Sequence, residues 1–189
     1  GESDRSDSSI LLGLMLPAML MPMLSTMSRV ALPMVRDTFA LTADLTAWID
    51  VSFTLPFMLF MPVYGRLGDG LGARRLLLAG IALFTLGTAL VLNASTMPHL
   101  LVGRTVQGIG LAGMTPLSIG LIASLFPPQT RGQTMGTWST VGPTTGFFGP
   151  LAAGLLVDAW GWQAACAPPL VCGLIAFVVV HRLIPACTH

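Results

Sequence analysis

Long runs of apolar residues, separated by short polar stretches, dominate the chain. After a polar start at 1–9, six such runs cover 10–35, 46–64, 76–93, 100–126, 132–157 and 164–180. A helix of about 20 residues crosses roughly 30 Å of hydrocarbon, and each run is close to that length. The runs lack the alternation of barrel strands, and open sheets would leave backbone groups without partners in lipid. The pattern predicts an all-α integral membrane bundle of six transmembrane helices over 10–184, followed by a tail or a truncation point at 185–189.

Composition agrees with a membrane location and narrows the chemistry. Hydrophobic residues make up 53% of the chain and charged residues 9%, against about 25% charged residues in a soluble domain. The short connections leave no room for a soluble catalytic domain, and nothing indicates nucleic-acid binding. Cys166, Cys172 and Cys187 lack the spacing of metal ligands, so we expect small buried side chains and no metal site.

Arginine placement orients the predicted helices. The turn between the second and third runs carries Arg66, Arg74 and Arg75, and short arginine-rich loops stay on the cytoplasmic side. With this turn inside, residues 1–9, the tail at 185–189 and six of the nine basic residues lie in the cytoplasm. We therefore expect a multi-pass protein of a bacterial-type inner membrane with both termini cytoplasmic.

The same turn holds a pattern of glycine, aspartate and arginine, made of Gly65, Leu67, Asp69, Gly72, Arg74 and Arg75. It resembles motif A of the major facilitator superfamily, and departs from it at Gly70 and Ala73, where the family often has basic residues. The resemblance implies that Asp69 helps to latch the cytoplasmic side between two halves of a transporter. We expect the glycines to allow a tight turn and Asp69 to cap a helix or lie against a helix amino terminus. The alternative is a generic positively charged turn.

The fourth run begins with a second signature, similar to motif B of the same family and made of Arg104, Gln107, Gly108 and Gly110. Arg104 lies about four residues into the predicted span, roughly 6 Å below the interface. Burying its charge costs about 2.5 kcal/mol or more unless the charge is paired or hydrated. Snorkelling to the outer surface is the alternative.

Two further charges lie at a similar depth near the outer surface. Asp50 is about four residues into the second run, and Arg29 is near the outer end of the first. We predict that Asp50 pairs with Arg104 or with Arg29 in the closed-outside state and is a candidate proton carrier, because charge inside the spans is scarce. An aspartate that merely hydrates at the membrane edge is the alternative.

The fifth run resembles motif C, which is associated with antiporters, and includes Gly146, Gly149, Pro150 and Gly154. Ala153 replaces a glycine of that motif. Small residues four apart permit close helix approach, and prolines bend the helix. In the family this face packs against the other half and seals the periplasmic path. Ordinary tight packing without directional meaning is the alternative.

The chain is most similar to the fourteen-helix drug:proton antiporter branch, through Ala31-Leu32-Pro33 and Trp48. Where that branch has an aspartate and an asparagine before Ala-Leu-Pro, this chain has Leu24 and Arg29. An acidic group that would attract cationic drugs is therefore missing. We expect an anionic, zwitterionic or neutral substrate rather than a cation.

The resemblance implies a secondary transporter that exports small organic molecules in exchange for protons by alternating access. It implies two three-helix inverted repeats per bundle and no cofactor beyond the proton gradient. The chain begins with Gly, so we expect an amino-terminal half or a fragment whose partner is a second six-helix bundle of the full-length chain or of a homodimer.

Two other classes of function compete with transport. A non-transporting membrane interaction or regulatory protein is the first. A membrane-embedded enzyme is the second, but we expect no catalytic residues because His99, His181 and His189 lie at span edges or in the tail.

Overall fold

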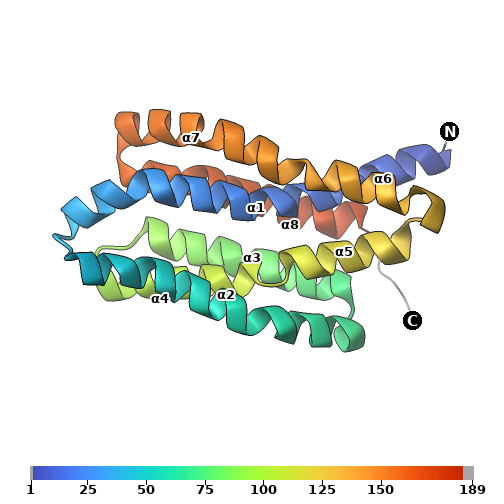
Figure 1. Ribbon diagram of the computed structural model, residues 1–189, viewed down its shortest axis with the longest axis horizontal. Helices are drawn as coiled ribbons and strands as arrows, with labels where there is room; N and C mark the ends of the chain where they lie inside the picture. The colour runs from blue at the N-terminus through green and yellow to red at the C-terminus, as the bar shows by residue number, and fades with distance from the viewer. Residues whose placement is uncertain (1, 185–189) are drawn as a thin grey trace.

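The computed structural model describes residues 2–184, and within them six stretches of helix are long and apolar enough to cross a membrane (Figure 1). These stretches are Asp4–Thr26, Ala43–Leu71, Ala73–Leu92, Met97–Leu125, Pro128–Trp160 and Trp162–Leu183. The predicted all-α bundle with six spans is confirmed. Cys187 and the rest of the predicted tail lie outside the described residues.

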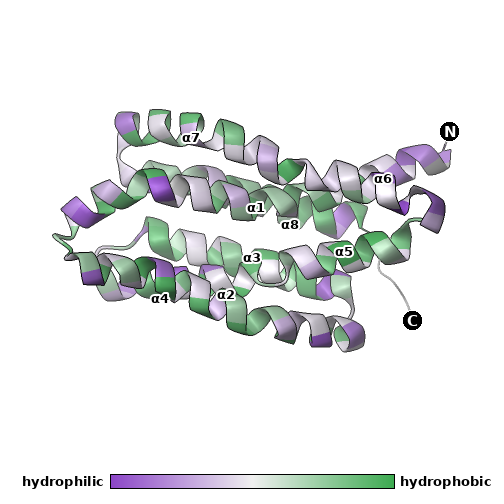
Figure 2. Ribbon diagram, viewed as in Figure 1, coloured by the Kyte–Doolittle hydropathy of each residue, from purple (hydrophilic) through white to green (hydrophobic). Residues whose placement is uncertain are grey.

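The first three stretches each lie within one helix, and each of the last three combines two consecutive helical elements. The helical elements are α1 (Glu2–Thr38), α2 (Ala43–Leu71), α3 (Ala73–Leu92), α4 (Met97–Leu111), α5 (Met114–Leu125), α6 (Pro128–Ser139), α7 (Val141–Trp160), the 3-10 helix η1 (Trp162–Cys166) and α8 (Ala167–Leu183). Figure 2 shows apolar residues along the middle of the helices and polar residues gathered at both ends of the bundle.

Two boundaries differ from the sequence pattern. Helix α1 begins at Glu2, so most of the polar start is helical; Glu2 and Asp4 in the first turn favour this because they face the positive end of the helix dipole. Helix α2 continues to Leu71, so the expected turn over 65–75 shrinks to Gly72. Gly72 has a φ of 92°, a conformation that glycine adopts without the strain other residues incur.

Prolines explain two breaks that the sequence pattern did not predict. Pro116 has no N–H to bond the carbonyl of Ala112, and α4 ends at Leu111. Pro143 likewise has none for the carbonyl of Ser139, where α6 ends. The spans Met97–Leu125 and Pro128–Trp160 are therefore helical on both sides of a short interruption.

The helices pack in a defined order. Helix α4 lies between α2 and α3, α1 contacts α7 and α8, and the α3–α8 contact joins the two groups. The α1–α2 connection at residues 39–42 and the α3–α4 connection at 93–96 lie at one end of the bundle, which we call the 39–42 end. The α2–α3 junction, which is Gly72, lies at the opposite end, with the start of α1 and the end of α8 (Figure 1).

The apolar core forms two clusters along the bundle axis. The larger cluster includes Leu14, Leu77 and Phe84, and the smaller cluster, towards the 39–42 end, includes Val35 and Trp162. Asp50 and Arg104 lie where these two clusters meet.

Candidate functional site

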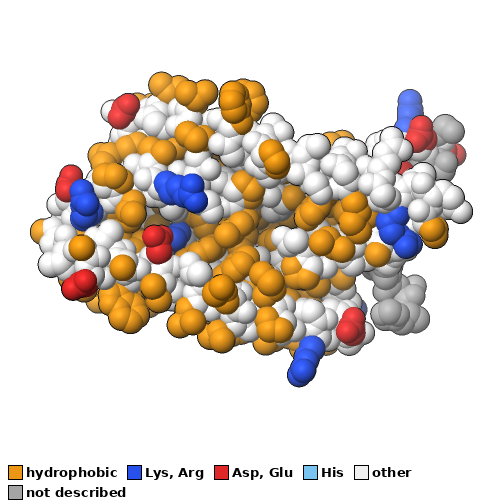
Figure 3. All heavy atoms as spheres, in the orientation of Figure 1, with side chains coloured by type: hydrophobic (Ala, Val, Ile, Leu, Met, Phe, Trp, Pro, Cys, Tyr) orange, Lys and Arg blue, Asp and Glu red, His pale blue; other side chains and the backbone are white. Residues whose placement is uncertain are grey.

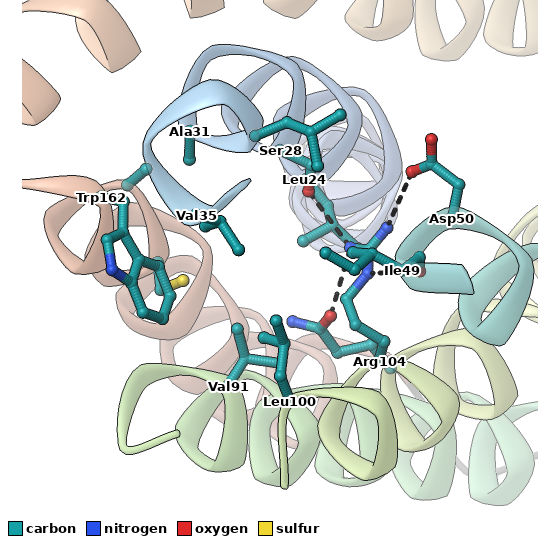
Figure 4. Close-up of a pocket in the computed structure, with 14 residues that line it drawn as sticks. Leu24, Ser28, Ala31, Val35, Ile49, Asp50, Val91, Leu100, Arg104 and Trp162 are labelled. Atoms are coloured by element: carbon teal, nitrogen blue, oxygen red, sulfur yellow. Dashed lines mark hydrogen bonds and ion pairs between the residues drawn. The ribbon is translucent and has the colours of Figure 1, made fainter. Parts of the chain in front are cut away.

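A small cavity of about 50 Å³ opens between α1, α2, α3, α4 and η1 (Figure 4). One water needs about 10–15 Å³ by this kind of measure, so the cavity has room for a few water molecules. Its polar lining comes from Ser28, Asp50, Arg104 and Gln107, and the rest is largely apolar. Polar groups and water can therefore meet here inside an apolar bundle.

Arg104 is the central group of this cavity. Its Nη1 donates to Ser28 Oγ at 3.1 Å and, at a longer 3.5 Å, to Gln107 Oε1. Its Nε donates to the carbonyl oxygen of Ile49 at 3.4 Å, and its guanidinium carbon lies 4.8 Å from the centre of the Phe53 ring. These contacts offset the cost of holding a guanidinium in the membrane interior. Arg104 is buried and held inside the bundle, so it does not snorkel to the surface.

Asp50 supplies the negative charge that faces Arg104. The Oδ1 of Asp50 lies 3.7 Å from Nη2 of Arg104, and it is the one ion pair within residues 2–184. The Asp50 side chain is 67% exposed and that of Arg104 only 7%. A separation of 3.7 Å is too long for a hydrogen bond. Asp50 is therefore loosely held, whereas Arg104 is fixed by several other acceptors.

A series of buried hydrogen bonds leads from Arg104 to helix α3. Nε2 of Gln107 donates to Oγ1 of Thr88 at 3.0 Å, and Thr88 in turn donates to the carbonyl oxygen of Phe84 at 2.8 Å. Both side chains are fully buried. Because the Thr88 hydroxyl donates its proton to Phe84, it can only accept a hydrogen bond from Gln107, and Nε2 of Gln107 must face it. The Oε1 of Gln107 therefore faces Arg104.

The structure shows which of the two predicted partners Asp50 contacts. Asp50 pairs with Arg104, and Arg29 is exposed without a carboxylate partner in the described part of the chain. Sequence reasoning missed Ser28 and Thr88, because single hydroxyl residues in an apolar helix carry no motif. It also assigned no role to Cys166, which is partly buried and lines the cavity; Cys172 is buried as expected.

The motif B glycines allow the close helix contacts that surround this site. A Cβ on Gly108 would overlap the carbonyl oxygen of Phe53 in α2, and one on Gly110 would overlap the backbone of Phe84 in α3. Helix α4 therefore approaches α2 and α3 at the level where Arg104 and Gln107 must reach their partners.

The motif A residues lie at the opposite end of the bundle. Arg74 donates from Nε to the carbonyl oxygen of Ile184 at 2.9 Å and from Nη2 to that of His181 at 2.8 Å, and so caps the end of α8. Asp69 is exposed, and the α3 amino terminus at Gly72 has no side-chain cap. Asp69 therefore does not cap α3, because α2 stays helical past Asp69. That Asp69 lies against a helix amino terminus stays a prediction.

The other motif A residues border a groove of about 640 Å³ between the α2–α3 junction and α5. Gly65 and Arg75 line it together with Asp69, while Leu67 is exposed on α2. Gly68 lies close to Leu117 of α5, where a Cβ would be 3.2 Å from Leu117 Cδ2.

The motif C residues divide between two sides of α7. Gly149 meets Thr26 of α1, whose Cγ2 would be 2.9 Å from an added Cβ. Gly146 and Gly154 have no neighbour within 4 Å of an added Cβ in the described structure, and Pro150 is exposed. Of these four residues, Gly149 is therefore the one whose Cα lies close to α1 in the described structure.

Six apolar membrane spans that enclose a buried, paired arginine define a polytopic membrane protein with a polar site inside its bundle. The model of the Major Facilitator Superfamily matches residues 14–186, and the chain belongs to that family.

Named relatives and a solved structure agree with this assignment. The chain is 34% identical to Multidrug resistance protein 3 of Bacillus subtilis, over 84% of this chain and 31% of that protein. It is 35% identical to the probable actinorhodin transporter of Streptomyces coelicolor, over 92% of this chain and 31% of that protein. A bacterial homolog of the human lysosomal transporter Spinster, in an inward-facing and unoccupied conformation, has the same fold with a TM-score of 0.74 at 22% identity.

The chain is shorter than these proteins. It spans about 31% of the length of the two curated relatives and 43% of the solved chain, while 92% of this chain is covered in the structural comparison. The six helices therefore correspond to one part of a major facilitator fold.

Proposed function

We propose that this chain is half of a proton-coupled antiporter that exports small organic molecules by alternating access. The observation that carries the proposal is the pairing of Asp50 with Arg104: a membrane-embedded carboxylate that is exposed and loosely held, beside an arginine that is buried and fixed. Ionisable residues inside membrane helices mark ion and substrate pathways.

Asp50 can act as the proton carrier because its loss of charge changes one contact and leaves the others in place. A proton that binds the Asp50 carboxylate removes the attraction to Arg104. Arg104 stays in position because Ser28, Ile49 and Gln107 still accept its hydrogen bonds. Release of the proton restores the pair, so the site has two charge states in one geometry.

The orientation follows from the distribution of arginines. Arg66, Arg74, Arg75, Arg131 and Arg182 belong to the Gly72 end of the bundle, which we assign to the cytoplasm. The 39–42 end then faces outward, and protons reach Asp50 from outside. Both termini are cytoplasmic in this arrangement.

The relatives support the kind of cargo, and their length supports a second bundle. One relative is named for multidrug resistance and another as a probable actinorhodin transporter, which favours small organic molecules. Alternating access needs two bundles that rock about a central site. The second bundle is another part of the full-length chain or a second copy.

Flux in vesicles tests the proposal. The protein as expressed in its native membrane is purified and reconstituted, and a pH gradient is imposed on vesicles that contain rhodamine B, its ethyl ester or fluorescein. We expect gradient-driven flux of at least one dye. Asp50→Asn should abolish the response of flux to the gradient and Asp50→Glu should retain it, with the exposed Asp44→Asn as the matched control.

Two results would contradict the proposal. Flux through Asp50→Asn that responds to the gradient as in the wild type would remove the proton-carrier role. Dye binding by the wild-type protein without any gradient-driven flux would favour a non-transporting membrane protein.

A further inference from the structure

Arg29 is a charge that the Asp50–Arg104 pair does not explain, and it lies in α1 three residues beyond the end of the apolar stretch Asp4–Thr26. It lies in α1 nine residues before the last residue, Thr38, about 13 Å from the helix end at roughly 1.5 Å per residue. It is exposed, while the neighbouring Ser28 reaches Arg104.

The charges inside this half of the bundle do not balance. Asp50 lies seven residues from the start of α2 and Arg104 seven from the start of α4, so both are about 10 Å from their helix ends. Arg29 lies at a similar depth. Together these groups carry two positive charges and one negative charge, and the one ion pair within residues 2–184 uses Asp50 and Arg104.

The side chains of Arg29 and Asp50 are both exposed in the described bundle. Helix α1 contacts α5, α6, α7, α8 and η1, so an exposed residue of α1 lies away from these neighbours. Figure 3 shows basic and acidic side-chain atoms inward from the ends on a face that is otherwise largely apolar. Ser25, one turn before Arg29, adds a half-buried hydroxyl to the same side of α1.

We propose that Arg29 and Asp50 bind opposite ends of a zwitterionic organic substrate. The Arg29 guanidinium, assisted by Ser25, binds an anionic group such as a carboxylate, and Asp50 binds the cationic group. This inference rests on the proposed antiport function and deepens it. The cationic group of the substrate competes with the proton for the same carboxylate, and this competition is what an exchange of substrate for protons requires.

A purely anionic or purely cationic substrate fits these charges less well. An anion beside Asp50 would favour the protonated aspartate, so proton and substrate would bind together and move in the same direction. A cation would compete with the proton at Asp50 but would be repelled by Arg29. A zwitterion satisfies both groups and keeps the competition.

Binding of matched xanthene dyes tests the proposal. Rhodamine B is a zwitterion, its ethyl ester lacks the carboxylate, and fluorescein lacks the cation. We expect the full-length protein in nanodiscs to bind rhodamine B tightest by fluorescence anisotropy. Arg29→Gln should weaken rhodamine B binding about tenfold or more and should strengthen binding of the ester, because it removes the repulsion between Arg29 and the cation, while Arg29→Lys restores rhodamine B binding. Asp50→Asn should weaken binding of both rhodamines. Arg36→Gln, at the exposed end of α1, is the control.

The proposal is overturned if Arg29→Gln weakens both rhodamines equally or neither, or if the ester or fluorescein binds as tightly as rhodamine B to the wild type. An equal loss for both rhodamines would show instead that Arg29 pairs with a carboxylate of the second bundle. These results are independent of flux, so failure of this inference is distinguishable from failure of the antiport function.

Discussion

Gln107 and Thr88 show how an arginine can be placed inside a membrane bundle. An isolated guanidinium with mobile partners would sample several orientations and present its charge to Asp50 only part of the time. Here the Gln107 amide donates to Thr88, and its oxygen faces Nη1 of Arg104. Because both residues are fully buried, the chain of contacts fixes Arg104 independently of Asp50.

We predict that Thr88→Val destabilises the protein by leaving the Gln107 amide without its acceptor. The side chains have the same shape, so the loss reports the hydrogen bond, with a cost of about 1–3 kcal/mol for an unsatisfied buried group. Thermal melting in detergent measures it. Thr105→Val is the control, since the Thr105 hydroxyl only bonds the carbonyl oxygen of Leu101 in its own helix.

A double substitution separates the hydrogen bond from general packing. Thr88→Val with Gln107→Leu removes both partners, which is less costly than orphaning one of them. We expect the double variant to lose less stability than the sum of the single losses. Additive losses would show that the two residues do not interact as the structure indicates.

The residues of the site differ in how well the sequence predicts them. Asp50 and Arg104 are predictable because charge is rare in the spans and both lie at one depth. The choice of Arg104 over Arg29 is not predictable, since it depends on the rotation of α1 about its axis. Ser28 and Thr88 are hydroxyl residues of a common kind, and only their positions opposite Arg104 and Gln107 distinguish them.

At the scale of elements, glycines set the distance between α3 and α4. Gly80 and Gly87 of α3 face Gly110 and Gly103 of α4, and at each of these positions an added Cβ would lie against backbone atoms of the opposite helix. Small residues at such contacts let backbones approach closely. This approach also brings Thr88 within hydrogen-bond distance of Gln107.

We predict that Gly110→Ala separates α3 from α4 and destabilises the protein by about 1–3 kcal/mol, as overpacking does. The added Cβ would lie 2.6 Å from the carbonyl oxygen of Gly80, and neither backbone can yield alone. Gly136→Ala is the matched control, because its Cβ meets nothing within 4 Å in the described structure. Equal melting temperatures for the two variants would contradict a tight α3–α4 contact.

The number of membrane spans was predictable, whereas the ends and the interruptions of the helices were not. Apolar runs fix the six spans because hydrocarbon thickness demands about 20 residues of helix. The breaks at Ala112 and Thr140 depend on where Pro116 and Pro143 withdraw a hydrogen bond, yet the prolines within α1 leave that helix continuous. A proline in an apolar run is therefore not sufficient to predict an interruption.

For the whole molecule, α7 carries two rows of residues with different sizes. One row consists of three glycines and a proline at four-residue spacing, namely Gly142, Gly146, Pro150 and Gly154. The adjacent row has Phe147, Leu151 and Leu155, all strongly exposed. Bulky apolar side chains suit lipid, whereas small ones suit another helix. The difference favours a second bundle against the small row and lipid against the large row.

We predict that Gly146→Trp in the full-length protein disrupts the contact between bundles, although an added Cβ at Gly146 meets nothing within 4 Å in the described structure. Leu151→Trp, on the large exposed row, should be tolerated because lipid accommodates the ring. Thermal stability in detergent and gradient-driven dye flux measure both variants. If Gly146→Trp is as stable and active as Leu151→Trp, the small row faces lipid, and the second bundle must cover a different side of these six helices.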